Sequence, residues 1–219
     1  MNKIKKLIKP IYHWLIRLSK WKRRIGLHCT DFTIISNNCT GGYVYQYFGV
    51  PYKTPTEGLY FTTEDYLKLV ERPEYYFKQE VKLIDSKEST LAKVGKDIHY
   101  PVGLIDDVEV YFMHYPDPKE ALSKWYRRAS RMNFNKLFFL LTETELAKEE
   151  HFTKFSQLIG CKTLNINDLG GVCLLLKDRK LPHTLYVPNV PKDETNGNAA
   201  WRPDIIINSL DWKKILNNL

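Results

Sequence analysis

One short stretch of the chain, SNNCTGG at residues 36–42, combines residue types suited to nucleophilic catalysis and to binding an anion. Cys39 is a candidate nucleophile, because a thiolate attacks carbonyl carbon readily. Side-chain amides can donate hydrogen bonds to a developing oxyanion, and glycines let backbone amides approach an anion closely. The candidate binding residues of this turn are Ser36, Asn37, Asn38, Gly41 and Gly42.

The same turn has a structural interpretation that stays open. A cysteine at such a position is commonly a small, inert residue. The glycine pair matches neither the GxGxxG spacing of dinucleotide-binding turns nor the GxxxxGK[ST] spacing of a P-loop. The stretch therefore indicates a site without defining its ligand.

Two further strand-like segments end in residues that can do chemistry. The segment 107–113 is followed by His114 and Tyr115, and 136–142 is followed by Glu143. In an open parallel sheet, sites form outside the carboxyl ends of the strands.

We therefore predict that Cys39, His114 and Glu143 meet at one sheet edge as nucleophile, base and orienting group. Cys39 would precede a helix, whose N-terminus favours a thiolate. The alternatives are a histidine that only hydrogen-bonds locally and a solvated glutamate.

Strand-like and helix-like segments alternate from residue 31 onward, which predicts an α/β fold. The continuous apolar run at 136–141 indicates a strand buried on both faces, as in a parallel sheet. We expect a mostly parallel sheet flanked by helices, in a Rossmann-like three-layer arrangement. The expected strands are 32–36, 107–115, 136–143, 162–166 and 172–176, and the expected helices are 41–49, 64–73, 117–132, 142–158 and 207–219.

The positive charge of the chain is concentrated at its beginning. The formal net charge is +8, and nine of the 33 Lys and Arg residues lie within residues 1–24, which contain no acid. The rest of the chain contains the other 24 Lys and Arg residues and 25 Asp and Glu residues, so its charges nearly balance. A nucleic-acid partner is not expected, because such proteins commonly spread basic residues over the folded domain.

Residues 3–25 form a pattern typical of an amphipathic helix at a membrane surface. Apolar residues, including two tryptophans, recur at steps of three and four, and Lys and Arg occupy the rest. We predict that residues 1–28 bind an anionic membrane surface and that 29–219 form a single α/β domain. The alternative is a helix packed on its own domain or on a second subunit. Pro10 is expected to break or kink its first turns.

We expect a cytoplasmic protein that is peripheral on the inner face of the cell membrane. No apolar run approaches the roughly 20 residues needed to span a bilayer. The cysteines, Cys29, Cys39, Cys161 and Cys173, show no CxxC spacing, so we expect reduced thiols and no metal.

The predicted helix at 117–132 has a basic face that includes Arg127 and Arg128. Guanidinium groups suit the phosphates of a nucleotide or of a lipid carrier. A solvated face is the alternative.

Two long stretches resemble a bacterial family of exopolysaccharide or capsular polysaccharide biosynthesis proteins of uncharacterised function. They are FTIISNNCTGGYVYQYFGVPYKTPTEGLYFTTEDYLK at 32–68 and YPVGLIDDVEVYFMHYPDPKEALSKWYRRASRMN at 100–133. The resemblance extends from about residue 30 to the C-terminus and includes the SNNCxGG turn and the KWxRR helix. More locally, Asn38-Cys39 with His114 is similar to the Asn-Cys turn of some capsule O-acetyltransferases, which bind coenzyme A.

The resemblance implies a transferase in cell-surface polysaccharide biosynthesis. It favours an O-acyltransferase that takes an acetyl group from acetyl-CoA and modifies a glycan or lipid-linked sugar. One alternative is a glycosyltransferase or another sugar-modifying transferase, although no Asp-x-Asp motif follows a predicted strand. Another is a non-catalytic, membrane-associated component of polysaccharide assembly.

Overall fold

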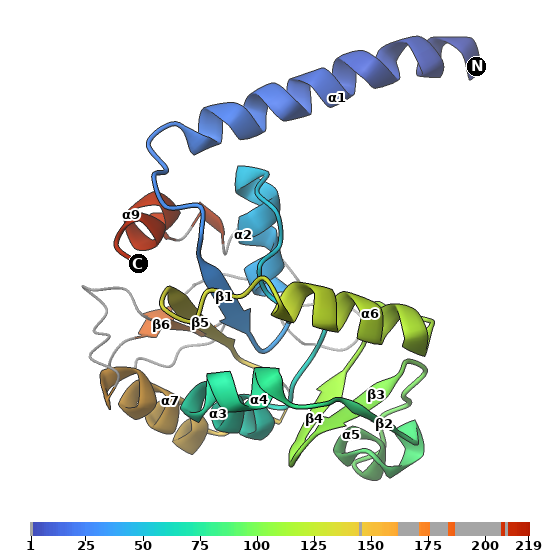
Figure 1. Ribbon diagram of the computed structural model, residues 1–219, viewed down its shortest axis with the longest axis vertical. Coiled ribbons are helices and arrows are strands. Elements are labelled where there is room, and N and C mark those ends of the chain that lie inside the picture. The colour runs from blue at the N-terminus through green and yellow to red at the C-terminus, as the bar shows by residue number, and fades with distance from the viewer. Residues whose placement is uncertain (1, 145, 162–170, 176–183, 187–206, 209) are drawn as a thin grey trace.

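The structure is a computed structural model that describes residues 2–144, 146–161, 171–175, 184–186, 207–208 and 210–219 (Figure 1). Its elements in chain order are α1 (Asn2–Arg24), β1 (Thr33–Ser36), α2 (Thr40–Phe48), α3 (Thr63–Glu71), α4 (Pro73–Lys78), β2 (Lys82–Ile84), the short 3-10 helix η1 (Ser86–Glu88), α5 (Thr90–Lys93), β3 (Val102–Ile105), β4 (Val108–Tyr111), α6 (Pro118–Ala129), β5 (Leu137–Thr142), α7 (Glu149–Cys161), β6 (Gly171–Leu175), β7 (Thr184–Tyr186) and α9 (Trp212–Asn217).

Within the described residues, a parallel sheet forms in the order β1-β5-β6-β7. β1 pairs with β5 in a register that matches Thr33 with Leu137 and Ser36 with Leu140. Every residue of β1 is buried, and so are the last five residues of β5. β5 is apolar almost throughout because both faces of the sheet are covered.

Alternate residues of β1 and β5 enter two different cores, because side chains alternate between the two faces of a strand. One core, which contains Ile35 and Phe139, includes residues of α3 and α7. The other, which contains Ile34 and Leu140, includes residues of α2 and α9. The predicted α/β class, with a parallel sheet flanked by helices, is confirmed, and a second, antiparallel sheet is added to it.

The segment around 107–115 belongs to a different sheet from the one predicted. β4 pairs antiparallel with β3, and β3 pairs antiparallel with β2, so these strands form a separate sheet. Asp106 and Asp107 make the two-residue turn between β3 and β4, and Asp106 has a positive φ of 55°. Aspartate tolerates this left-handed conformation in hairpin turns. A clear Rossmann-like three-layer fold is therefore not what the structure shows.

The segment Glu57–Phe61, which begins in a turn, lies between the two sheets and joins them. Tyr60 forms an isolated antiparallel bridge with Tyr111 at the end of β4. On the other side, the Phe61 amide donates to the carbonyl of Asn37, just after β1, at 2.9 Å. The carboxyl end of the parallel sheet is thereby fixed relative to the antiparallel sheet.

The remaining predicted helices are found, with shifted ends. α6 begins as expected, with Asp117 capping the amides of Lys119 and Glu120 and with Pro118 at the first position. α7 begins at Glu149 and not near residue 142. α1 continues through Pro10, so the predicted break is wrong. The predicted strand at 162–166 lies outside the described residues.

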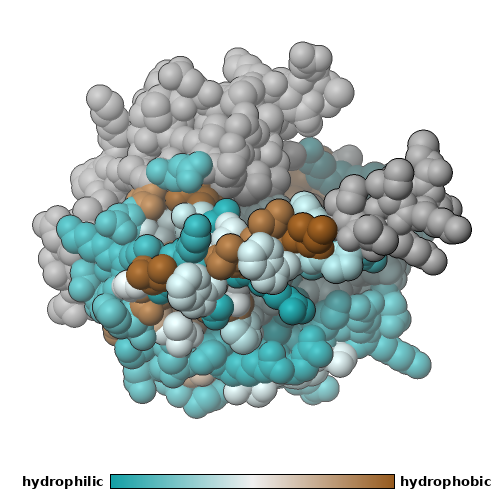
Figure 2. All heavy atoms as spheres, turned by 90° about the horizontal axis from the view of Figure 1, so that it is seen from above, coloured by the Kyte–Doolittle hydropathy of each residue, from teal (hydrophilic) through white to brown (hydrophobic). Residues whose placement is uncertain are grey.

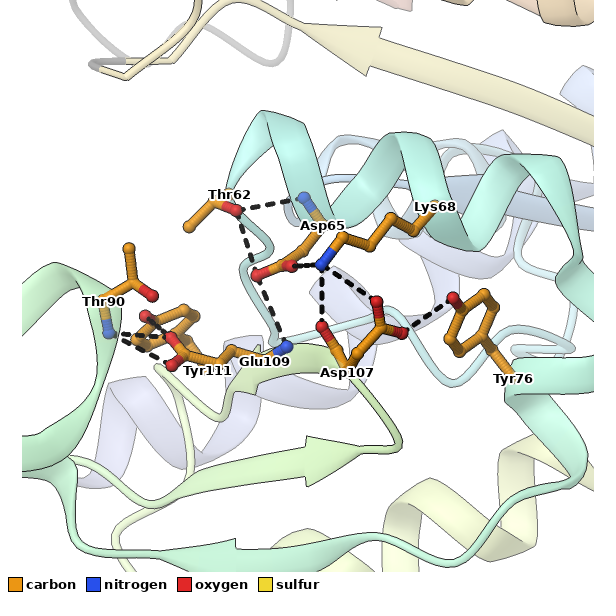
Figure 3. Close-up of polar contacts among 8 residues, drawn as sticks. All are labelled: Thr62, Asp65, Lys68, Tyr76, Thr90, Asp107, Glu109 and Tyr111. Atoms are coloured by element: carbon orange, nitrogen blue, oxygen red, sulfur yellow. Dashed lines mark hydrogen bonds and ion pairs between the residues drawn. The ribbon is translucent and has the colours of Figure 1, made fainter.

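A buried carboxylate connects α3 to the antiparallel sheet (Figure 3). Asp65 accepts from the hydroxyl of Thr62 at 3.1 Å and from the amide of Glu109 at 3.4 Å. Lys68 forms ion pairs with Asp65 at 3.3 Å and with Asp107 at 3.2 Å. Burial raises the pKa of Asp65 to about 6, because the cost of burying its charge exceeds the lowering effect of the nearby positive charge of Lys68.

The raised pKa of Asp65 predicts a pH-dependent stability. Its pKa of about 6 in the folded state exceeds the ordinary value of 3.8, so the folded state binds the proton more tightly. The contribution of Asp65 to stability is therefore greatest below about pH 4 and falls as the pH rises through about 6. Relative to the wild type, Asp65→Asn should gain up to about 3 kcal/mol in free energy of unfolding over this window, measured by urea denaturation.

Asp107→Asn is the matched control. The hydrogen bond from Tyr76 lowers the pKa of this exposed carboxyl below its ordinary value. The contribution of Asp107 to the free energy of unfolding is therefore present throughout the same pH window. The difference in stability between Asp107→Asn and the wild type should show no pH trend there. Parallel pH curves for the two variants would contradict the assignment to Asp65.

Candidate functional site

The SNNCTGG turn, which follows β1, satisfies its own backbone amides. The hydroxyl of Ser36 donates to the carbonyl of Asn38 at 2.5 Å and accepts from the amide of Gly41 at 3.1 Å. Asn38 Oδ1 accepts from the amide of Thr40 at 3.0 Å and from its hydroxyl at 2.6 Å. The amides predicted to receive an anion are therefore already used within the turn.

Asn37 is a structural clamp. It is fully buried, and its side chain donates to the carbonyl of Thr142 at 2.9 Å and accepts from the Thr142 amide at 3.0 Å. Asn38 Nδ2 also donates to the hydroxyl of Thr142 at 2.5 Å. These contacts hold the ends of β1 and β5 together and use one N–H donor of each side-chain amide, so the role of both asparagines as oxyanion donors stays a prediction.

The two glycines of the turn leave room for two different neighbours. A Cβ on Gly41 would lie 2.9 Å from Ile34 Cγ2 and 2.8 Å from Ser36 Oγ, so the helix approaches β1 too closely for a side chain. A Cβ on Gly42 would lie 1.3 Å from Glu57 Oε2. The carboxyl group of Glu57 thus occupies the space above Gly42, at the first turn of α2.

Glu57 is the central residue of the site, and sequence reasoning missed it. Its Oε2 atom is buried and has no hydrogen-bond partner among the described residues. Burial raises the pKa of its carboxyl, while the positive charge of Arg128 and the hydroxyl of Tyr52 act to lower it. A carboxyl group with a raised pKa is suited to exchange protons near neutral pH.

Cys39 lies at the N-cap of α2, as expected, but it does not favour a thiolate. Its sulfur donates to the carbonyl of Leu59 at 3.9 Å. Burial, and then the negative charge of Glu57, raise the pKa of the thiol to about 11. The predicted low pKa is therefore wrong: at neutral pH the resting group is a neutral thiol.

Arg128 and Tyr115 join α6 to the Glu57 segment. Arg128 Nη1 donates to the carbonyl of Glu57 at 2.8 Å and to the hydroxyl of Tyr115 at 2.6 Å. The Tyr115 hydroxyl donates to the same carbonyl at 2.9 Å. Arg128 also lies over the ring of Tyr52, 5.1 Å from its centroid. Arg127 is exposed, so the structure brings one member of the predicted basic pair into the site.

His114 reaches the site through its backbone. Its amide donates to the carbonyl of Gly58 at 3.2 Å, while its side chain is exposed. The imidazole makes no hydrogen bond with Cys39 within the described residues, so the predicted base and nucleophile are not paired. Glu143 is half-buried and follows Thr142 at the end of β5. Its orienting role stays a prediction.

The site therefore consists of Cys39, Tyr52, Glu57, Tyr115 and Arg128, around the first turn of α2 and one side of α6 (Figure 1). It combines a carboxyl group with a raised pKa, a neutral thiol and a guanidinium group, which suits proton transfer beside an anionic ligand. Among the described residues, no group of three or more His, Cys, Asp or Glu side chains is placed to hold a metal ion.

Comparison with known proteins places this site inside a family domain. The family model described as "Domain of unknown function (DUF1919)" matches residues 12–160, which include every residue of the site. The chain belongs to this family. It is also similar to an uncharacterised protein of Haemophilus influenzae, with 32% identity over 126 residues. That alignment covers 58% of this chain and 56% of the relative, so the chain matches about half of the relative's length.

The raised pKa of Cys39 leads to a prediction about its reactivity. Thiol alkylation at Cys39, measured by peptide-resolved mass spectrometry, should be slow at neutral pH and accelerate toward about pH 11. Glu57→Gln removes the neighbouring negative charge and should shift the alkylation profile to lower pH. Cys29, which contacts Lys136 outside the site, is the internal control and should not respond. An unshifted Cys39 profile in Glu57→Gln would contradict the coupling.

Proposed function

We propose that this protein is a transferase of cell-surface polysaccharide biosynthesis that moves an acyl group, such as acetyl, from a thioester donor to a hydroxyl group of a glycan precursor. The observation that carries the proposal is the Glu57 carboxyl. It is buried above Gly42 and held between Cys39 and Arg128. A purely structural glutamate at this position would be expected to have a partner for each buried oxygen.

In the proposed reaction, the Glu57 carboxylate accepts the proton of the acceptor hydroxyl. The hydroxyl oxygen attacks the thioester carbon, a C–O bond forms, and the C–S bond breaks. The departing sulfur then takes the proton from Glu57, so the products are the O-acyl sugar and the free thiol of the donor. A carboxyl with a raised pKa suits both proton transfers. Near its pKa it is populated both as the carboxylate that accepts the hydroxyl proton and as the acid that protonates the sulfur.

Arg128 is proposed to bind the anionic part of a substrate. Its Nη1 atom is used by Glu57 and Tyr115, while its other nitrogens make no hydrogen bond within the described residues. Guanidinium groups bind phosphate groups in a bidentate manner. Both coenzyme A and a lipid-linked sugar carry such phosphates, so either substrate suits this position.

Cys39 is proposed to line the acyl site as a neutral thiol, and direct transfer does not require it as a nucleophile. A covalent route would need Glu57 to remove the thiol proton first, against a pKa of about 11. The exposed His114 is kept as an alternative base, because its backbone is anchored to the same segment through Gly58.

The finer description of the fold also belongs to this proposal. Cores on both faces of the parallel sheet support a Rossmann-like arrangement, in which substrates bind at the carboxyl ends of β1 and β5. Glu57 and Cys39 lie at this end of β1.

The catalytic assignment predicts a sharp loss of acetyl transfer in Glu57→Gln. With radiolabelled acetyl-CoA as donor and a lipid-linked glycan extract as acceptor, the turnover number should fall at least 100-fold, because the general base is lost. Cys39→Ser should retain turnover within about tenfold, and His114→Ala within about threefold, since neither is the base. Unchanged turnover in Glu57→Gln, or a 100-fold loss in His114→Ala, would overturn the assignment to Glu57.

Gly42→Ala provides a second, independent variant. The added Cβ must displace the flexible end of Glu57, so the carboxyl moves while alanine favours the helix. The free energy of unfolding, measured by thermal denaturation, should change by about 1 kcal/mol or less. The turnover number of acetyl transfer should fall nearly as far as in Glu57→Gln. A thermal shift with a nucleotide sugar and none with acetyl-CoA would favour a glycosyltransferase instead.

A further inference from the structure

Helix α1 extends away from the body of the protein and contacts it through its last turns (Figure 1). The side chain of Lys20 packs against Gly49, at the end of α2, where a Cβ would lie 2.7 Å from Lys20 Cδ. Arg23 Nη1 donates to the carbonyl of Tyr47 at 3.4 Å, and its guanidinium lies 4.4 Å from the centre of that ring. The helix is thus attached to its domain mainly through basic residues.

The side of α1 that faces the domain is defined by half-buried residues. Ile16, Ser19, Lys20 and Arg23 are partly covered, and their spacing of three and four residues places them on one side of the helix. The side chains toward the other end of the described helix, from Lys9 to Leu15, are exposed. The sequence-based alternative of a helix packed on its own domain is met in part, because the last turns of α1 contact α2 while Ile11, Trp14 and Trp21 stay exposed.

The apolar face of α1 points away from the domain. Ile11, Trp14, Leu15 and Trp21 recur at helical spacing and are 59%, 61%, 50% and 55% exposed. Tyr12, at the edge of this face, is 59% exposed. Figure 2 shows brown and pale atoms gathered in a band across the face seen from above, bordered by hydrophilic atoms. An apolar band of this kind on the surface marks an interaction site.

The charge of α1 identifies the kind of partner. Residues 1–24 contain nine Lys and Arg and no acid, and Arg17 and Arg24 are exposed beside the apolar band. Tryptophans prefer the boundary between headgroups and acyl chains. No helix within the described residues has the length and apolar character needed to cross a bilayer. Apolar, aromatic and cationic groups on one helix complement an anionic lipid surface.

We infer that α1 lies in the headgroup boundary of an anionic lipid bilayer, with Ile11, Trp14, Leu15 and Trp21 inserted. This inference rests on α1 and holds whether or not the proposed transfer reaction is correct. This position of α1 places the domain below the lipid surface, and the C-terminal end of α2 is the part of the domain nearest to the lipid. The candidate site lies at the other end of this nine-residue helix, about 14 Å away, a distance suited to a sugar carried on a lipid phosphate.

Vesicle co-sedimentation of the full chain tests this inference. Binding to phosphatidylcholine vesicles that contain roughly 30% phosphatidylglycerol should be at least tenfold stronger than binding to phosphatidylcholine alone. The attraction of the basic residues to anionic lipid then adds to the burial of the apolar face. The double variant Trp14→Glu/Trp21→Glu should lose at least tenfold in binding to the anionic vesicles. Raising the salt concentration should weaken binding of the wild type, since screening reduces the charge attraction.

Arg17→Gln/Arg24→Gln is the matched control, because it lowers the net charge by the same two units without removing apolar surface. It should bind anionic vesicles more tightly than the tryptophan variant. Equal binding of the two variants, or equal binding of the wild type to both vesicle types, would overturn insertion of the apolar face into anionic lipid. A lipid-free dimer that the tryptophan variant converts to a monomer would identify a second copy as the occupant. The vesicle assay measures lipid binding and not acetyl transfer, so failure of the catalytic proposal would leave these outcomes unchanged.

Discussion

The segment Glu57–Phe61 is hydrogen-bonded on both of its sides, and the arrangement of the whole site depends on it. Phe61 binds Asn37 at the end of the parallel sheet, and Tyr60 bridges to Tyr111 in the antiparallel sheet. At the start of the segment, the Glu57 carbonyl accepts from Arg128 and Tyr115, and the Gly58 carbonyl accepts from the amide of His114. The chain therefore has little freedom here, because the backbone groups of a buried segment must stay paired. The consequence is that Glu57 is held over the first turn of α2, where Gly42 leaves room for its carboxyl.

Burial, and not the helix terminus, sets the chemistry of Cys39. A helix N-terminus stabilises a neighbouring negative charge by about 0.3–1 kcal/mol at an accessible position. The change in the pKa of Cys39 from 9.0 to about 11 corresponds to about 3 kcal/mol in the opposite direction. The nearby amides are also engaged, since Ser36 and Asn38 already bind those of Gly41 and Thr40. Glu57 is consequently the group best suited to move a proton.

Predictions from the sequence were accurate where the signal was local. The strand Leu137–Thr142 was recognised because its apolar run reflects burial on both faces, and α6 because Asp117 and Pro118 mark its start. The partner of β4 was not predicted, because pairing depends on the turn at Asp106-Asp107, which is not the common Asn-Gly or Asp-Gly pair. That error moved His114 to the wrong sheet, although its backbone still meets the site through Gly58.

The sequence by itself determined the composition of this protein's special segments: a turn of polar residues, cysteine and glycines after a buried strand, and a cationic amphipathic helix without acids. These follow from residue type and spacing along the chain. The tertiary structure decided what the residues do. It used Asn37 as a clamp on Thr142, placed Glu57 against Gly42, and attached α1 through Lys20 and Arg23 so that its apolar face points outward. Such outcomes depend on contacts between segments far apart in the chain, and local patterns do not encode which segments meet.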